Sequence, residues 1–313
     1  MNSQLETVVF EMEKAVRGKR GVIEHILAAL LAEGHILLDD MPGVGKTTLA
    51  VALSRAVDLR YRRVQFTPDV MPSDIVGFSV YEPQSGQFVY HEGAATRANL
   101  LLGDEINRTS SKTQSALLEA MEERQITVDG RTYPLEKPFV VIATQNNVGT
   151  AGTQFLPYAQ VDRFMVRLSV GYPDHDAQMA LLRDRLSENP LDAVERVLTR
   201  EELLAMQADV RAVQTGDALL DYITRLTMAS REHPNVEVGV SPRGALLLCR
   251  MAKARAYLRG RTFAVSEDVQ AVFEPVCAHR LIVSAKARLA GVSAADVVRE
   301  LLADVPNPDR AAL

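Results

Sequence analysis

Short apolar runs recur along the first half of the chain, each separated from the next by a helical or irregular stretch. Residues 21–32 place apolar side chains at helical intervals, and four apolar runs follow at residues 35–38, 64–66, 100–102 and 139–144. Strands that are apolar on both faces and alternate with helices are typical of a parallel sheet covered on both sides. The pattern therefore predicts an α/β fold.

Two segments depart from this rhythm and predict β-hairpins inserted into the α/β core. Residues 78–81 and 88–90 flank the turn sequence Pro83-Gln84-Ser85-Gly86. Residues 126–128 and 131–133 flank Asp129-Gly130, a two-residue turn of the kind that joins antiparallel strands.

From about residue 189 onward, helical periodicity replaces the short apolar runs. Ser241-Pro242 predicts an N-cap followed by proline at the first helical position, in a helix that runs to about Leu258. Further helix starts are indicated by Ser3 with Glu6, by Thr199 with Glu202, and by Ser266. We expect residues 1–188 to form the α/β core and residues 189–313 a smaller, all-helical lid domain.

Composition narrows the class of protein. The 313 residues include 35 Lys and Arg against 40 Asp and Glu, and 47% are hydrophobic, which is typical of a soluble globular chain. The net charge of -5 falls entirely on residues 1–188, because residues 189–313 have 16 basic and 16 acidic residues. A domain that mainly coats nucleic acid usually has a net basic face, so this function is disfavoured.

The cysteines and the chain start point to the cytoplasm as the expected compartment. Cys249 and Cys277 lack the spacing of metal ligands and fit reduced thiols. The first 14 residues are too polar for a signal peptide, and no apolar stretch approaches the ~20 residues that cross a bilayer.

The most specific motif follows the first apolar run and precedes an apolar-periodic helix. Small residues there allow consecutive backbone N–H groups to surround phosphates, with a lysine for the outer phosphates and a threonine hydroxyl for Mg²⁺. The predicted nucleotide-binding residues are Pro42, Gly43, Val44, Gly45, Lys46, Thr47 and Thr48. Asp40 occupies the position where the strict pattern has glycine, so its carboxylate should point away from the phosphates or be held by a neighbour.

Two later strands end in polar residues that suit the same site. The run at residues 100–102 leads to Asp104, which suits a metal ligand, and Glu105, which suits activation of the attacking water. The run at residues 139–144 leads to Asn146, whose amide could contact both a phosphate and the water. In an open parallel sheet these strand ends meet at one edge, where ligands bind.

Together, in this order, these features resemble an AAA+ ATPase, and longer segments narrow the resemblance to the MoxR family. Those segments are residues 65–69 (QFTPD), 72–75 (PSDI), 99–108 (NLLLGDEINR), 112–124 (KTQSALLEAMEER) and 143–146 (ATQN). The resemblance spans nearly the whole chain. It implies a ring, expected to be a hexamer, that uses ATP and Mg²⁺ to remodel, mature or insert metal into other proteins, often with a partner that bears a von Willebrand factor A domain.

The resemblance also assigns roles to individual residues. Asn146 matches the first sensor position, and Arg163 matches the arginine finger that reaches a neighbouring subunit's γ-phosphate. Arg243 matches the second sensor on the lid, and the turn from Val16 to Gly18 matches the start of the adenine-contacting segment.

Several alternatives stay open at this point. Arg163 could instead pair with Asp162, and Arg243 could be a solvated first-turn residue. Residues 147–149 and Tyr158 depart from the family pattern near the expected subunit boundary. A magnesium-chelatase-like motor subunit or a nucleic-acid translocase could use the same core. The translocase would use the basic run Arg250, Lys253, Arg255, Arg259 and Arg261, which otherwise forms a solvated or subunit-facing side of a lid helix.

Overall fold

The structure is a computed structural model that describes residues 2–146, 156–187 and 189–310. Its centre is a five-stranded sheet in the order β2-β5-β8-β1-β9 with all neighbouring strands parallel. The strands are β1 (Ile36–Asp39), β2 (Tyr61–Gln65), β5 (Leu100–Asp104), β8 (Val140–Gln145) and β9 (Val166–Leu168). The predicted α/β fold with a parallel sheet is confirmed.

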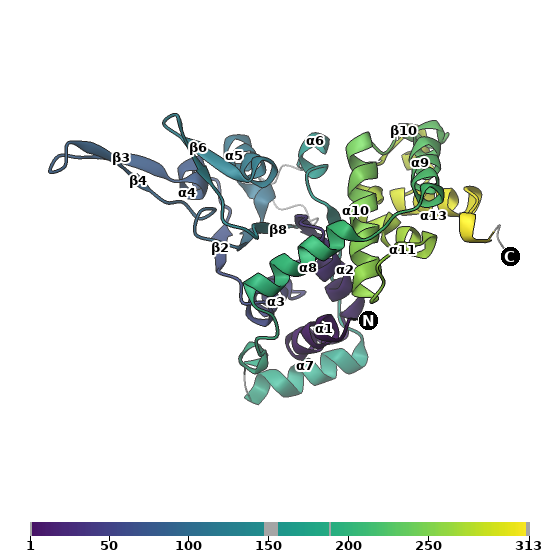
Figure 1. Cartoon of the computed structure of the whole chain (residues 1–313), viewed down its shortest axis with the longest axis horizontal. Coiled ribbons are helices and arrows are strands. Elements are labelled where there is room, and N and C mark those ends of the chain that lie inside the picture. The colour runs from purple at the N-terminus through teal and green to yellow at the C-terminus, as the bar shows by residue number, and fades with distance from the viewer. Residues whose placement is uncertain (1, 147–155, 188, 311–313) are drawn as a thin grey trace.

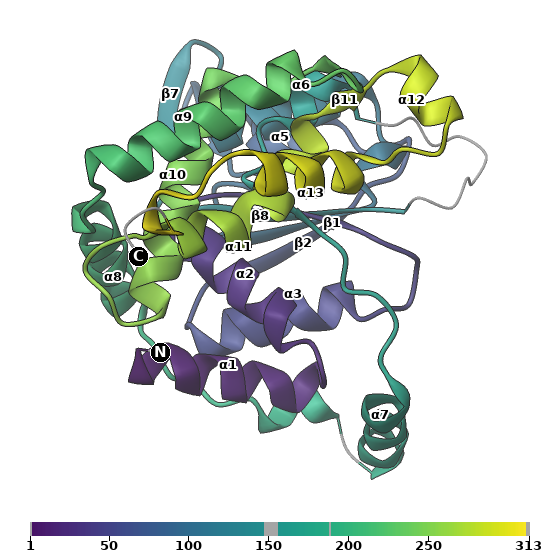
Figure 2. The same cartoon turned by 90° about the vertical axis from the view of Figure 1, so that its right-hand side faces the viewer.

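Alternation along the strands divides the apolar side chains between two layers. Leu38, Leu100 and Ile142 belong to the large cluster that includes α1–α3, whereas Leu37 and Leu101 belong to a second cluster with α5. The helices of this part are α1 (Ser3–Ala15), α2 (Arg20–Leu31), α3 (Lys46–Ala56), α4 (Pro72–Val76), α5 (Ser111–Glu123), α6 (Tyr158–Val161) and α7 (His175–Ser187). Figure 2 shows α1, α2 and α3 on one side of the sheet.

Both predicted hairpins are present. Strands β3 (Phe78–Glu82) and β4 (Gln87–His91) pair antiparallel, as do β6 (Gln125–Val128) and β7 (Arg131–Pro134). The β3–β4 hairpin projects far from the body of the molecule (Figure 1). It therefore presents a long surface that the sheet and its helices do not cover.

Helices dominate the later part of the chain, as the periodicity predicts, but a short ladder interrupts them. The helices are α8 (Arg200–Ala212), α9 (Asp217–Glu232), α10 (Pro242–Leu258), α11 (Ser266–Cys277), α12 (Ala285–Leu289) and α13 (Ala294–Asp304). Strands β10 (Val236–Val238) and β11 (Ile282–Val283) pair antiparallel. The expectation of an all-helical lid misses this ladder because its strands are very short and far apart in sequence.

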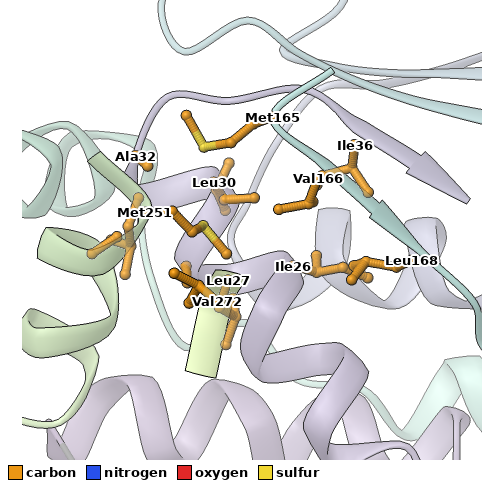
Figure 3. Packing of buried hydrophobic residues seen from close by; sticks show 14 of the residues in the cluster. Ile26, Leu27, Leu30, Ala32, Ile36, Met165, Val166, Leu168, Met251 and Val272 are labelled. Atoms are coloured by element: carbon orange, nitrogen blue, oxygen red, sulfur yellow. The ribbon is translucent and has the colours of Figure 1, made fainter. Parts of the chain in front are cut away.

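The lid shares one hydrophobic core with the sheet domain. Met251 of α10 and Val272 of α11 lie in the same buried cluster as Leu27 and Leu30 of α2 and Val166 of β9 (Figure 3). The contact is continuous, so the lid is packed against one edge of the sheet.

None of the helices in the described parts of the chain combines the length and apolar character needed to cross a bilayer.

Candidate active site

The phosphate loop connects β1 to α3 and adopts the geometry that its glycines permit. Gly43 and Gly45 have φ values of +83° and +94°, a region that side chains with a Cβ rarely adopt. A Cβ built on either residue would meet nothing within 4 Å, so the inside of the loop is open. Helix α3 begins at Lys46, directly after Gly45. The open loop and the helix N-terminus together can accept an anion.

Lys46 is buried and links the phosphate loop to the end of β8, the strand beside β1. Its Nζ donates to the carbonyl oxygen of Asp40 at 2.7 Å, to that of Gln145 at 3.2 Å, and to Asn146 Oδ1 at 2.6 Å. Burial lowers the pKa of Lys46, although Asp40 and Asp104 oppose the change. The ammonium thus lies between the ends of β1 and β8, at the edge where phosphates would bind.

Asp40 is held by neighbours, as expected. Oδ2 accepts hydrogen bonds from Ser169 Oγ at 2.9 Å and from the Gly171 N–H at 2.6 Å, and Oδ1 accepts from the Met41 N–H at 2.8 Å. Burial opposes ionisation, but the bonds from Gly171, Ser169 and Met41 outweigh it and the pKa of Asp40 is lowered. The carboxylate therefore fastens the phosphate loop to the segment after β9.

Asp40→Asn is expected to lower the urea midpoint of unfolding at pH 7, because charge-assisted hydrogen bonds of this kind contribute about 1.5–3 kcal/mol. The folded pKa is lowered, so this contribution is complete above the unfolded pKa of ~3.9 and is lost as the pH falls through the folded value. The two midpoints should converge on acidification. Asp176→Asn, on a fully exposed side chain, is the control, and an equal loss there would contradict the assignment.

Thr144 links the Asp104 carboxylate to the Glu105 backbone at the end of β5. Its Oγ1 donates to Asp104 Oδ1 at 2.6 Å and accepts from the Glu105 N–H at 2.9 Å. Asp104 Oδ2 also pairs with Arg63 of β2 at 2.7 Å. One hydroxyl on the neighbouring strand therefore fixes the positions of both acidic residues.

Glu105 adopts a left-handed backbone conformation, with φ of +57°, that redirects its side chain at the strand end. Oε1 accepts from Asn146 Nδ2 at 2.9 Å, and Oε2 accepts from Arg108 Nη1 at 2.7 Å and Gln65 Nε2 at 3.1 Å. Asn146 therefore bridges Lys46 and Glu105. Oε1 accepts only one of these bonds, so it retains capacity to accept a hydrogen bond from water.

Sequence reasoning missed Thr144, Gln65 and Arg63. Thr144 and Gln65 are polar residues near the ends of their strands, and Arg63 is in the middle of β2. The register that places Arg63 and Gln65 beside β5 cannot be read from local pattern. The available signal was position, since Thr144 and Gln65 lie at the carboxyl ends of strands next to the acidic pair.

The chemistry of the donors fits a nucleotide with Mg²⁺. Thr47 and Asp104 offer hydroxyl and carboxylate oxygens, which Mg²⁺ prefers together with water and phosphate oxygens. Among the described residues there is no group of three or more His, Cys, Asp or Glu that could hold a metal by itself.

A cavity of about 860 Å³ adjoins the loop at the junction of core and lid. It is lined by Asp39, Asp40 and Met41 and by residues of α2, β9, α11 and α13. Its volume suits a nucleoside. Asp39 is buried there and pairs with Arg167.

The Val16–Gly18 turn lies against the segment after β9. Val16 is buried at the end of α1, and a Cβ on Gly18 would meet Ala177 Cβ at 3.2 Å. Lys19 Nζ donates to the Tyr172 carbonyl at 2.7 Å. The adenine contact of this turn stays a prediction from the resemblance.

Arg163 and Arg243 lie together, but away from their own phosphate loop. Glu122 Oε2 pairs with Arg163 Nε at 3.0 Å and Glu122 Oε1 with Arg243 Nη1 at 2.9 Å. Both arginines line a cavity of about 410 Å³ with His35, which precedes β1, whereas the phosphate loop follows β1. A four-residue strand is about 13 Å long. The arginines therefore lie at the amino ends of the parallel strands, and the phosphate loop lies at their carboxyl ends.

The alternative pairing of Arg163 with Asp162 is wrong, because Asp162 binds Arg280 at 2.8 Å. Arg243 is also paired, so it is not simply solvated. Tyr158, a departure from the family pattern, donates to the Arg280 carbonyl at 2.8 Å. The departure at residues 147–149 lies outside the described residues.

Members of the basic run mostly have partners within the chain. Arg259 pairs with Glu24, Arg261 with Asp268, and Lys253 donates to the Arg211 carbonyl. This leaves less of the run available to nucleic acid.

The strand order, the phosphate loop after β1 and the helical lid define a P-loop protein of the AAA class, and comparison with known proteins agrees. Residues 35–166 match the family described as "ATPase family associated with various cellular activities (AAA)", and residues 228–301 match the AAA lid domain. The chain belongs to the MoxR family of AAA+ ATPases.

The relatives cover nearly the whole chain. YeaC of Bacillus subtilis is 41% identical over 97% of this chain and 95% of its own. Chaperone MoxR1 of Mycobacterium tuberculosis is 36% identical over 97% and 82%, and protein MoxR of Methylorubrum extorquens 31% over 95% and 93%. A crystal structure from Cytophaga hutchinsonii, described as an ATPase, has a TM-score of 0.90 and 35% identity, covering 97% of this chain and 95% of that one.

Proposed function

We propose that the chain hydrolyses ATP with Mg²⁺ and couples hydrolysis to the remodelling of partner proteins. The observation that carries the proposal is the continuous hydrogen-bond network from Lys46 through Asn146 to Glu105 and through Thr144 to Asp104. It brings a phosphate-binding cation, an acidic pair and a sensing amide to one edge of the sheet.

Each residue of the network has a defined task in this proposal. Lys46 binds the outer phosphates, and Thr47 and Asp104 hold Mg²⁺, which when bound offsets phosphate charge. Glu105 orients the attacking water and accepts its proton at a carboxylate oxygen. Asn146 Nδ2, which donates one hydrogen to Glu105 Oε1, donates the other to a phosphate oxygen, which links nucleotide state to the position of Glu105.

We further propose that Arg163 and Arg243 act on the nucleotide of a neighbouring subunit in a ring, with a hexamer as the expected closed form. Both arginines lie at the amino ends of the parallel strands, opposite their own phosphate loop, and this supports the arrangement. Arg108, which now pairs with Glu105, lies on the phosphate-loop side.

The β3–β4 hairpin supports a remodelling role. Phe78, Tyr81 and Phe88 are exposed by 49%, 53% and 66% on a projecting element, where apolar segments of another protein could bind. Chaperone MoxR1 is similar to 97% of this chain.

The proposed partner is a protein with a von Willebrand factor A domain, and the proposed compartment is the cytoplasm. Residues 1–188 remain the proposed core and residues 189–313 the proposed lid.

Lys46→Ala is expected to abolish ATP binding, because it removes the buried ammonium from the phosphate edge. The test measures nucleotide binding by calorimetry and phosphate release at several protein concentrations, with and without Mg²⁺. Lys286→Ala, on an exposed lid lysine, is the control. Wild-type protein that neither binds nor hydrolyses ATP at any concentration would contradict the proposed function.

A further inference from the structure

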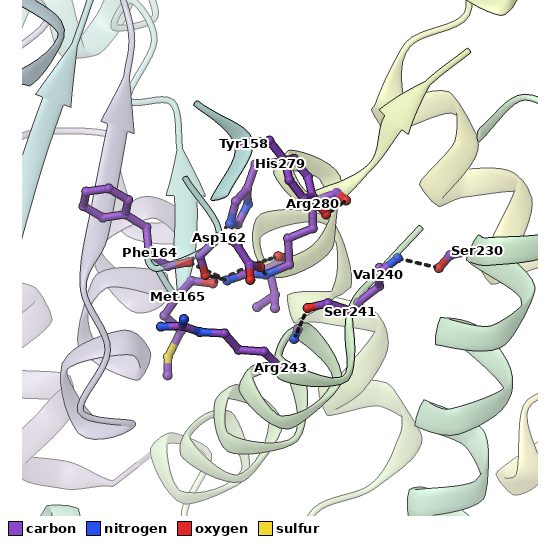
Figure 4. Close-up of polar contacts among 12 residues, drawn as sticks. Tyr158, Asp162, Phe164, Met165, Ser230, Val240, Ser241, Arg243, His279 and Arg280 are labelled. Carbon is purple, nitrogen blue, oxygen red and sulfur yellow. Dashed lines mark hydrogen bonds and ion pairs between the residues drawn. The ribbon is translucent and has the colours of Figure 1, made fainter. Parts of the chain in front are cut away.

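Arg280 is the largest fully buried side chain of the described residues, and it carries a positive charge. It belongs to a short 3-10 turn, η3 (Ala278–Arg280), which follows α11 in the lid. Figure 4 shows its side chain reaching from the lid toward the segment that contains Asp162, Phe164 and Met165. A charged group in this position needs several partners to offset the loss of water.

The partners of Arg280 surround Arg163 in sequence. Nε donates to Asp162 Oδ1 at 2.8 Å, and Nη2 donates to the carbonyl oxygens of Asp162 at 2.9 Å and Phe164 at 2.6 Å. Nη1 donates to the Met165 carbonyl oxygen at 3.3 Å and also to the carbonyl oxygen of Val276 in α11 of the lid. The residues on both sides of Arg163 are thus bound to one lid side chain.

A residue of the core also donates a hydrogen bond to Arg280. Tyr158 Oη, from α6, donates to the Arg280 carbonyl at 2.8 Å. The segment that carries Arg163 is therefore fastened to η3 through both the side chain and the backbone of Arg280.

Arg280 also contacts the start of α10, where Arg243 lies. A Cβ on Gly244 would come within 2.9 Å of Arg280 Cδ and 2.7 Å of Val240 Cγ1, so only glycine fits beside the arginine. Ser241 caps this helix by accepting from the Gly244 N–H at 3.0 Å. The arginine side chain therefore passes directly between the Arg163 segment and the first turn of α10.

A buried ion pair is weak evidence for a role in stability, because well-packed apolar residues of similar volume often give equal or greater stability. The guanidinium is the side chain that can hold a carboxylate and several carbonyls in fixed directions at once. This geometry suits a residue that fixes positions.

We propose that Arg280 is a positioning residue that holds Arg163 and Arg243 as one rigid element, so that both arginines present themselves together to the nucleotide of the next subunit. The proposal rests on the proposed function, since it assumes that Arg163 acts across a subunit boundary. In this proposal Arg280 itself contacts neither the nucleotide of its own subunit nor that of the next subunit.

Arg280→Lys keeps the charge but loses the fork that binds Asp162 and the carbonyls. Hydrolysis should fall by about 100-fold, the effect of a displacement of about 1 Å at a catalytic group, with ATP affinity unchanged. Mixing this variant with Glu105→Gln subunits should restore activity, because the second subunit supplies an intact Arg163 to the intact nucleotide site of the first. A merely structural role would give no such rescue.

Arg261→Lys is the matched control, since Arg261 also binds a buried lid carboxylate, Asp268, but touches no residue of the Arg163 segment. It should keep hydrolysis near the wild-type rate. Wild-type hydrolysis by folded Arg280→Lys would overturn the proposal, as would a loss that mixing does not rescue. If Arg163→Ala is rescued by mixing and Arg280→Lys is not, the positioning role alone fails.

Gly244→Ala serves if Arg280→Lys does not fold. Its Cβ would meet Val240 Cγ1 at 2.7 Å and Arg280 Cδ at 2.9 Å, so Arg280 would have to shift although its charge and its partner residues are unchanged. A drop in hydrolysis of about tenfold or more, rescued by Glu105→Gln subunits, is expected from the same displacement argument. Gly216→Ala, where a Cβ would meet nothing within 4 Å, is the control, and equal rates in both variants would overturn the proposal.

Discussion

Arg163→Ala should lower steady-state ATP hydrolysis by about 10³–10⁵-fold while leaving ATP binding intact, as expected for removal of an arginine finger. The reason is geometric: Arg163 lies at the amino ends of the parallel strands, next to Glu122 and Arg243, whereas its own phosphate loop lies at the carboxyl ends. A group in that place can stabilise charge on a phosphate only across a subunit boundary. Phosphate release and nucleotide affinity of the purified variant measure the effect.

A mixing experiment separates a role across the boundary from a loss of folding. Arg163→Ala subunits retain Glu105, and Glu105→Gln subunits retain Arg163, so mixed boundaries should recover part of the activity. Arg196→Ala, which breaks an exposed pair with Asp58, is the control and should hydrolyse normally. If Arg163→Ala alone hydrolyses at the wild-type rate, the finger assignment fails.

Glu105→Gln should bind ATP yet lose hydrolysis by about 10²–10⁴-fold, the usual contribution of a general base. Glutamine keeps one oxygen that can accept from Arg108 and Gln65, whereas the contact with Asn146 Nδ2 has to rearrange because the other terminal atom becomes a donor. What it lacks is the capacity to accept a proton from the attacking water. Single-turnover phosphate release, with ATP binding measured separately, isolates this step.

The control for Glu105→Gln is Glu237→Gln, an exposed carboxylate on β10. It should leave both binding and hydrolysis unchanged. Wild-type hydrolysis by Glu105→Gln would remove Glu105 from its role as base, whereas loss of ATP binding would show that its bonds to Gln65, Asn146 and Arg108 serve mainly to hold the loop.

The parts of the site that the sequence predicts are those with local signals. Gly43, Gly45 and Lys46 lie within four consecutive positions, and the acidic pair closely follows a buried apolar run. Strand and loop geometry therefore follow from neighbouring residues. Lys46, Asp104, Glu105 and Asn146 meet as expected because parallel strands end at one edge.

The parts that the sequence does not predict depend on distant partners. Asp162 and Arg280 are 118 residues apart, and no local pattern selects Arg280 over Arg163 as the partner of Asp162. Arg243 lies beside Arg163 only because the lid packs on the edge of β9 rather than over the loop. Such pairings follow from tertiary packing.

Helix starts show the same limit on a smaller scale. Thr199 caps α8 with Glu202 as predicted. Asn2 and Val265, however, take the cap positions that the sequence assigns to Ser3 and Ser266. Asn and Ser are nearly equal as caps, so local preference does not decide between Asn2 and Ser3. At α11, Asp268 accepts from the Val265 N–H while Ser266 bonds to Asp309, a contact distant in sequence.

The shared hydrophobic core of the two matched regions also bears on how the chain folds. Two family models match separate stretches of the sequence, yet Met251 and Val272 of the lid pack in one cluster with Leu27 and Leu30 of the core. Water cannot enter between the two parts without exposing that cluster. We therefore expect the lid and the sheet to unfold together as one cooperative unit, although separate family models match them.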